Sequence, residues 1–283
     1  MSGTRNRTIE IEGRGSFHVV VAGPAGDASG GGAATAATPA LLLHGLGADA
    51  TLWRHVLPAL GRDRTVYAAD LRGHGRTRSE GAAAADFSLA AHAADALALA
   101  EALAPGAAPL HLLGTSLGGV IAQIAAAEQP GRFASLVLAC TWCAAPPGLD
   151  AAALADAIAA APDIRVHFAA VVRAMLPDHH DDAVALLDAI ATADRAALVQ
   201  GARELFAYSG SHRLAAIAAP ALVVSADRDD MFPHAAAQAI AAGLAQAQLG
   251  VLSGCGHAPY VDRPGLFAGV VGGFWNAQDA AQR

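Results

Sequence analysis

Short apolar runs alternate with longer, alanine-rich segments along most of the chain. The apolar runs have strand-like lengths and lie at residues 9–12, 17–22, 40–45, 65–70, 110–114, 135–140, 220–226 and 247–252. The alanine-rich segments have the length and composition of helices and lie at residues 52–60, 87–103, 118–130, 234–244 and 264–275. Alternation of this kind is typical of a parallel sheet that carries helices on both faces. The pattern therefore predicts an α/β fold.

The alternation pauses over residues 143–214, where the sequence is helical in pattern but poor in strands. Helices inserted between two strands of a parallel sheet are expected to cover its carboxyl edge, where open α/β sheets bind ligands. We therefore expect one core domain, formed by residues 1–142 and 215–283, and a helical cap formed by residues 143–214. Residues 23–39 are rich in Gly, Ala and Thr without a periodic apolar face, which predicts a surface loop.

The composition narrows the range of partners. The 283 residues carry a formal net charge of -7, so neither nucleic acid nor an acidic membrane surface is an expected partner. No segment has the apolar core of a signal peptide or the length of a membrane span. Three cysteines are too few for a disulfide framework, and this favours a cytoplasmic protein. We expect a small-molecule substrate, and the sequence gives no indication of the oligomeric state.

Ser116 lies in a turn between a predicted strand and a predicted helix. The segment GTSLG at residues 114–118 has the G-x-S-x-G pattern that forms a nucleophile elbow in this context. The serine of such an elbow has a strained backbone, so the residues two before and two after it must be small, as Gly114 and Gly118 are. The amide of Leu117 would then lie at a helix N-terminus, where an oxyanion is stabilised. The pattern predicts a nucleophile, with a serine that only caps the helix as the alternative.

His257 follows a predicted strand in a glycine-flanked loop and precedes the last predicted helix. A histidine that comes after the serine and the acid in chain order is the expected general base. The acid must then lie between them, and Asp227, Asp229 and Asp230 all follow the predicted strand at residues 220–226. Successive side chains at a strand end point in different directions, so only one of the three can face the histidine. The residue types alone leave this choice open.

These motifs together resemble the α/β-hydrolase superfamily, and the resemblance extends from about residue 16 to about residue 276. The segment HGLG at residues 44–47 is similar to the oxyanion turn of that family, and DLRGHG at residues 70–75 is similar to its D-x-R-G-x-G segment. Ser116 corresponds to the elbow serine, and GH at residues 256–257 to the terminal G-H. The resemblance implies the α/β-hydrolase fold, which is a mostly parallel eight-stranded sheet with helices on both faces and a helical cap.

The resemblance also implies roles for individual residues. The family places its acid in a G-x-x-D-x-x-x-P pattern, and Pro233 fits this pattern with Ala226 in the Gly position, which selects Asp229 over its two neighbours. The backbone amides of Leu46 and Leu117 would form the oxyanion hole. A serine at the elbow argues against the haloalkane dehalogenase and epoxide hydrolase branches, which have aspartate there.

The predicted reaction is that of a serine hydrolase, which forms an acyl-enzyme and needs neither a metal nor an organic cofactor. Phe168, Met175 and Phe206 of the predicted cap, with Trp142 below them, are predicted to line an apolar pocket. Such a pocket favours a small or medium neutral carboxylic ester, lactone or thioester, as in carboxylesterases and 3-oxoadipate enol-lactonase-like enzymes. The alternatives are a carbon–carbon bond hydrolase, a methylesterase, a cyclising thioesterase of secondary metabolism, and a non-catalytic ligand-binding protein of the same fold.

Two other groupings look like motifs but are assigned no chemistry. Cys140 and Cys143 form a C-x-x-C pair, yet they end a strand-like run, whereas redox pairs lie at helix N-termini. The run HHDD at residues 179–182 contains metal-ligand residue types, but adjacent side chains do not converge on one ion. We therefore predict no metal site.

Overall fold

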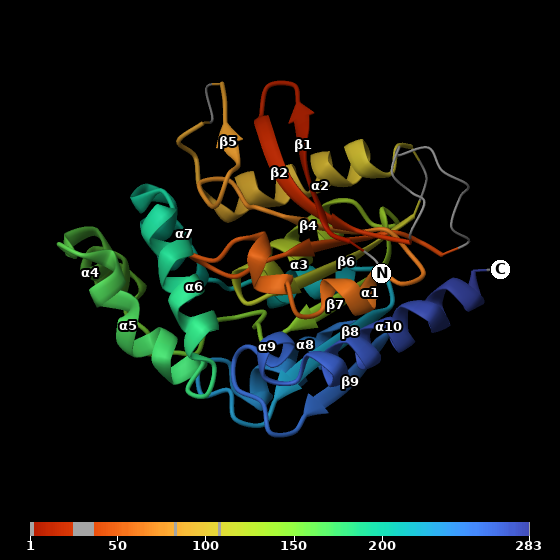
Figure 1. Cartoon of the computed structure of the whole chain (residues 1–283). Helices are drawn as coiled ribbons and strands as arrows, with labels where there is room; N and C mark the ends of the chain where they lie inside the picture. Colours follow the sequence, from red (N-terminus) through yellow and green to blue (C-terminus); the bar gives the residue numbers. More distant parts are fainter. Residues whose placement is uncertain (1–2, 25–36, 82–83, 107–108, 283) are drawn as a thin grey trace.

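A mixed β-sheet forms the centre of the computed structural model, which describes residues 3–24, 37–81, 84–106 and 109–282 (Figure 1). Within these residues the strand order is β1-β2-β4-β3-β6-β7-β8-β9, and a short β5 pairs with β2. β2 is antiparallel to β1, β4 and β5, whereas all pairs from β4 through β9 are parallel. The strands are β1 (Arg5–Ile11), β2 (Gly15–Ala22), β3 (Ala40–Leu43), β4 (Val66–Ala69), β5 (Arg78–Ser79), β6 (Leu110–Thr115), β7 (Phe133–Ala139), β8 (Ala221–Ala226) and β9 (Ala247–Leu252). The prediction of a mostly parallel sheet is confirmed, with β5 added to the eight predicted strands.

Helices cover both faces of this sheet, because alternate residues of each central strand point to opposite sides. Leu41 and Leu43 of β3 belong to a buried cluster that also contains side chains of α2, α3 and α8, while Leu42 belongs to a second cluster that contains side chains of α1 and α10. The helices of these two layers are α1 (Leu57–Leu60), α2 (Leu89–Leu103), α3 (Leu117–Glu128), α8 (His234–Gly243) and α10 (Pro264–Ala281). Strands buried on both faces read as the continuous apolar runs seen in the sequence.

Four helices lie between β7 and β8, in the segment for which the sequence predicts a cap. They form two packed pairs, α4 with α7 and α5 with α6, and they lie to one side of the sheet in Figure 1. Their bounds are α4 (Ala151–Ala160), α5 (Ile164–Met175), α6 (His180–Thr192) and α7 (Arg195–Phe206), and the 3₁₀ helix η2 (Ser211–Ala216) leads back to the sheet. Asp150, Asp163 and Asp194 cap the N-termini of α4, α5 and α7 with their side chains.

One predicted element differs from the structure, and another lies partly outside the described residues. The predicted helix at residues 52–60 is divided into the 3₁₀ helix η1 (Ala50–Trp53) and the short α1, since Pro58 lacks an N–H and is favoured only in a first helical turn. In the predicted surface loop, residues 23–24 and 37–39 form no helix or strand, and residues 25–36 lie outside the described residues. Among the described helices, none has both the length and the apolar character needed to cross a bilayer.

Candidate active site

Ser116 occupies the turn between β6 and α3 with φ 53° and ψ −120°, a conformation that is strained for any residue except glycine. Glycines make this turn possible. A Cβ atom at Gly114 would overlap the carbonyl oxygen of Gly118, and a Cβ atom at Gly118 would overlap that of Leu43. The strand and the helix therefore approach each other as closely as the G-x-S-x-G pattern predicts.

His257 lies between β9 and the short helix α9 (Pro259–Asp262), with its Nδ1 atom 2.9 Å from Oδ2 of Asp229. The other carboxylate oxygen of Asp229 accepts the backbone N–H groups of Met231 and Phe232, at 3.0 and 2.9 Å. Burial by itself raises the pKa of Asp229, but the His257 contact and these two N–H groups outweigh it and hold the pKa below its ordinary value. An ionised Asp229 makes Nδ1 of His257 the proton donor, which leaves Nε2 free to act as a base.

Phe232 packs against one face of the His257 imidazole ring. The two rings stack with centroids 4.9 Å apart and an interplanar angle of 16°. Because the same residue donates its backbone N–H to Asp229, Phe232 orients both members of the pair.

The two neighbouring aspartates point elsewhere. Asp227 is exposed and accepts hydrogen bonds from the Ser253 hydroxyl and the Gly254 backbone N–H, both at 2.8 Å. Asp230 is also exposed. Of the three candidates for the acid, Asp229 is the one that faces His257.

The two residues predicted to form the oxyanion hole, Leu46 and Leu117, lie near the serine. Leu117 is the first residue of α3, and Leu46 lies in the loop after β3. Across the described residues, neither N–H has a protein acceptor. Gly45 brings the loop close, since a Cβ atom there would lie 3.2 Å from Cβ of Ser116. Both amides are thus available to an oxygen bound next to the serine.

Buried polar side chains hold the loop that carries Leu46. The N–H of Gly47 donates to Nε2 of His74 at 3.1 Å, and the N–H of Ala50 donates to Asp70 at 2.7 Å. Burial lowers the pKa of His74 to about 3, so its ring is neutral and its Nε2 can accept. The segment at residues 70–75, which is similar to the family's D-x-R-G-x-G segment, thereby holds the loop that carries Leu46.

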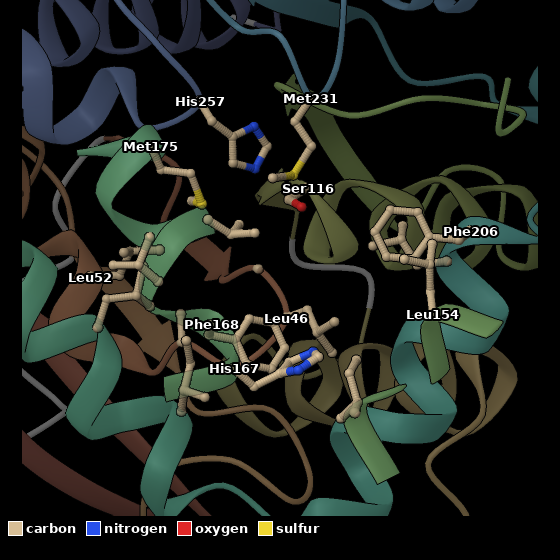
Figure 2. Close-up of a pocket in the computed structure, with 18 of the residues that line it drawn as sticks. Leu46, Leu52, Ser116, Leu154, His167, Phe168, Met175, Phe206, Met231 and His257 are labelled. Atoms are coloured by element: carbon tan, nitrogen blue, oxygen red, sulfur yellow. The ribbon is translucent and has the colours of Figure 1, made fainter. Parts of the chain in front are cut away.

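A cavity of about 240 Å³ opens beside Ser116 and His257. Figure 2 draws these two side chains together at one end of the cavity, with Met231 beside them and His167 and Phe168 at the other end. The lining is apolar apart from Ser116, two histidines and the tyrosine Tyr260, and none of the described residues that line it is Asp, Glu, Lys or Arg. The other lining residues are Gly45, Leu46, Ala48, Leu52, Leu154, Ala157, Ile158, Val171, Val172, Met175, Leu186, Ile190, Leu205 and Phe206.

The structure brings three of the four predicted pocket residues to this cavity. Phe168, Met175 and Phe206 line it, whereas Trp142 is buried behind them, packs against Phe206 and Phe232, and donates its indole N–H to the Leu205 carbonyl. The other cavity residues of α4, α5, α6 and α7 were not predicted from the sequence. A signal was present in α5, whose cavity residues recur at helical spacing at 167, 168, 171, 172 and 175.

Cys140, Asp229 and His257 form the one group of metal-ligand side chains with suitable spacing among the described residues. One ligand atom from each lies within 4.8 Å of the others. Asp229 and His257 already share a hydrogen bond, which a metal ion would have to displace. The donor set therefore fits a hydrogen-bonded pair better than a metal site.

Comparison with known proteins shows that the chain is similar to hydrolases. The model of the alpha/beta hydrolase family matches residues 40–270. The chain is 33% identical over 243 residues to RutD of Variovorax paradoxus (strain S110), which is provisionally named a carbamate hydrolase, with 80% of this chain and 87% of the relative covered. It is 28% identical to the 2-hydroxymuconate semialdehyde hydrolase of Pseudomonas sp. (strain CF600), with 86% and 88% covered. The enol-lactonase of Burkholderia xenovorans LB400 has the same fold, with a TM-score of 0.79 at 20% identity and 95% and 100% covered.

Proposed function

The chain belongs to the alpha/beta hydrolase family and is a hydrolase, and we propose that it cleaves neutral carboxylic esters, lactones or thioesters through an acyl-enzyme on Ser116. One observation carries the proposal. An elbow serine and a histidine paired with a buried carboxylate lie at one end of an apolar cavity, beside Leu46 and Leu117, whose backbone N–H groups have no acceptor among the described residues. This is the arrangement that nucleophilic acyl transfer requires.

In the proposed mechanism, Nε2 of His257 accepts the Ser116 proton as the hydroxyl oxygen attacks the substrate carbonyl. Asp229 keeps the proton of His257 on Nδ1 and stabilises the imidazolium that forms. The amides of Leu46 and Leu117 donate to the oxyanion of the tetrahedral intermediate. The leaving group takes the proton from His257, and a water molecule then releases the acyl group by the reverse sequence. Neither a metal ion nor an organic cofactor takes part in these steps.

The lining of the cavity supports a neutral substrate with an apolar acyl group. A carboxylate buried here would find no cationic Lys or Arg side chain among the described lining residues, and burying an unpaired charge is costly. This disfavours a carboxylate-bearing substrate of the kind named for the muconate semialdehyde hydrolase. A small polar carbamate would likewise leave most of the apolar lining without contact.

We propose that α4–α7 act as a cap that sets the choice of substrate, since both α4 and α5 contribute side chains to the cavity. The core domain would then be residues 1–142 and 215–283. We also propose a cytoplasmic site of action, which agrees with three free, buried cysteines.

Labelling by a fluorophosphonate tests the nucleophile. We expect the probe to modify Ser116 in the native protein and to leave Ser116→Ala unmodified. Labelling of another residue, or none in the folded native protein, would contradict the proposal. Turnover of a panel of p-nitrophenyl esters, lactones and vinylogous diketones then separates an esterase or lactonase from a carbon–carbon bond hydrolase.

Narrowing the cavity tests the substrate class. Val171 lines the cavity from α5 and is 42% exposed, whereas Val166 on the same helix is 72% exposed and lies outside the lining. We expect Val171→Phe to shift the preference among p-nitrophenyl esters from octanoate towards acetate. Val166→Phe is the matched control and should leave the preference unchanged. An unaltered preference in Val171→Phe would place the acyl group outside this cavity.

A further inference from the structure

Cys140 has a backbone conformation that its residue type does not favour. It follows the last residue of β7, and its φ of 45° makes it, with Ser116, one of two described residues other than glycine with a positive φ. This conformation is strained for a residue with a Cβ atom, and glycine or asparagine adopts it more readily. Strain of this kind persists where the surrounding structure holds the residue in place and is frequent at functional sites.

The backbone of Cys140 is tied to both sides of the proposed site. Its carbonyl oxygen accepts the N–H of Ser116 at 3.2 Å, beside the Ala139 carbonyl at 3.1 Å. Its own N–H donates to the Val224 carbonyl of β8 at 2.9 Å. β8 is the strand that leads into Asp229. Cys140 therefore connects the elbow of the nucleophile to the strand of the acid.

The side chain of Cys140 lies at the acid itself. Its sulfur belongs to the group in which one atom each of Cys140, Asp229 and His257 lie within 4.8 Å of one another. Cys140 is only 3% exposed, and the Asp229 side chain is fully buried. Burial, followed by the neighbouring charge of Asp229, raises the pKa of the thiol well above its ordinary value. The sulfur therefore keeps its proton and lies near a carboxylate that can accept a hydrogen bond from the S–H group.

We propose that Cys140 is a positioning residue of this hydrolase, whose S–H supports the Asp229 carboxylate while its carbonyl holds the amide of Ser116. The inference rests on the proposed function, because it assigns to Cys140 the task of holding the proposed acid, Asp229, and the proposed nucleophile, Ser116, in position relative to each other. In Asp229 the two backbone N–H groups hold one oxygen and His257 takes the other. In the proposed role, the thiol of Cys140, which lies within 4.8 Å of a ligand atom of Asp229, adds a weak donor to this carboxylate.

Four single variants of the full chain test this role with p-nitrophenyl butyrate. Cys140→Ala removes the donor and should lower kcat about tenfold with little change in KM, since one weak bond to a charged group is lost. Cys140→Ser keeps a donor and should retain most of the activity. Cys140→Gly relieves the backbone strain but lacks the donor, so we expect a melting temperature at least as high as that of the native protein, together with the low kcat of Cys140→Ala. Cys143→Ala, at a buried cysteine three residues away, is the matched control and should be fully active.

The pH profile separates positioning from a general loss of structure. Without the thiol, more of the Asp229 charge acts on His257, so the acid limb of kcat/KM should move to higher pH in Cys140→Ala and return in Cys140→Ser. A native rate and profile in Cys140→Ala would overturn the inference, as would equal losses in the Ala and Ser variants. If instead the native protein neither hydrolyses esters nor reacts with the fluorophosphonate, the proposed function itself fails.

Discussion

Nδ1 of His257 lies 2.9 Å from Oδ2 of Asp229, and the N–H groups of Met231 and Phe232 turn the carboxylate towards that contact. Asp229→Asn removes the charge that fixes the imidazole tautomer. We expect kcat for p-nitrophenyl esters to fall by on the order of a thousandfold or more, with the fold intact by circular dichroism.

The exposed neighbour of this acid supplies the control. Asp230→Asn changes the same group one residue away, and its activity should stay near the native value. If Asp230→Asn or Asp227→Asn lost more activity than Asp229→Asn, the acid would have to be reassigned.

Gly201 of α7 makes room for Leu46, whose backbone N–H is one of the two proposed oxyanion donors. A Cβ atom at Gly201 would lie 2.8 Å from Cδ1 of Leu46. We expect Gly201→Val to displace Leu46 and to lower kcat about tenfold or more, while KM changes little, because the amide acts chiefly on the transition state. The measurement is steady-state kinetics with p-nitrophenyl butyrate.

Gly269, an exposed helical glycine in α10 with no neighbour within 4 Å of an added Cβ atom, provides the comparison. Gly269→Ala should keep the native kcat and raise the free energy of unfolding by about 0.5–1 kcal/mol, owing to better helix propensity. Native kinetics in Gly201→Val would show that the oxyanion loop is insensitive to α7.

Because several histidines are buried, we expect the protein to lose stability in mild acid. Burial lowers the pKa of His74 to about 3 and that of His111 to about 4, and it shifts His44 and His92 in the same direction. These groups titrate near pH 6.5 in the unfolded chain, which therefore binds protons that the folded chain does not between about pH 6.5 and pH 4. The free energy of unfolding should decrease as the pH falls through this range, by up to about 1.4 kcal/mol per pH unit for each histidine. Urea denaturation near pH 7 and near pH 5 measures the difference, and equal stability at both would contradict the assignment.

Burial of His92 is expected to lower the free energy of unfolding. Neither of its ring nitrogens has a hydrogen-bond partner within the described part of the chain, although its ring is buried beside His74. An unsatisfied buried polar group costs about 1–3 kcal/mol. We therefore expect His92→Leu to raise the melting temperature and to reduce the dependence of stability on pH. A lower melting temperature in His92→Leu would mean that the ring contributes more by packing than it costs by burial.

Most of the fold could be predicted because the central strands are buried on both faces. The run Ala40–Leu43 is apolar at every position, follows a proline and precedes a glycine-containing loop, so the sequence marks both the strand and its boundaries. The two-residue β5 and the division of the predicted helix at Pro58 escaped the pattern. β5 is too short to be periodic, and the apolar pattern of residues 52–60 does not show that Pro58, which lacks an N–H, restricts the α-helix to a short segment in which it occupies the first turn.

The candidate site was predictable to different depths for different residues. Ser116 could be predicted because its turn requires glycine at positions 114 and 118, and both glycines lie in the same five-residue segment as the serine. The proposed role of Cys140 and the place of His167 in the cavity lining could not be predicted from local sequence in this way. Their neighbours come from β8 and from the far end of a cavity between helices, so their surroundings exist only after the chain has folded.

The contact between α6, α7 and the loop after β3 has a consequence for engineering. Ile190 and Leu198 approach Gly47, and Leu46 lies against Gly201, so the helices that shape the cavity also press on a proposed oxyanion amide. We therefore expect that residues 143–214 cannot be exchanged for the cap of a relative without a second effect. A new cap that changed substrate preference would also lower kcat unless it kept the surfaces of α6 and α7 that contact this loop. Point changes at Val171, which takes no part in that contact, offer a route to new substrates that leaves the turnover machinery as it is.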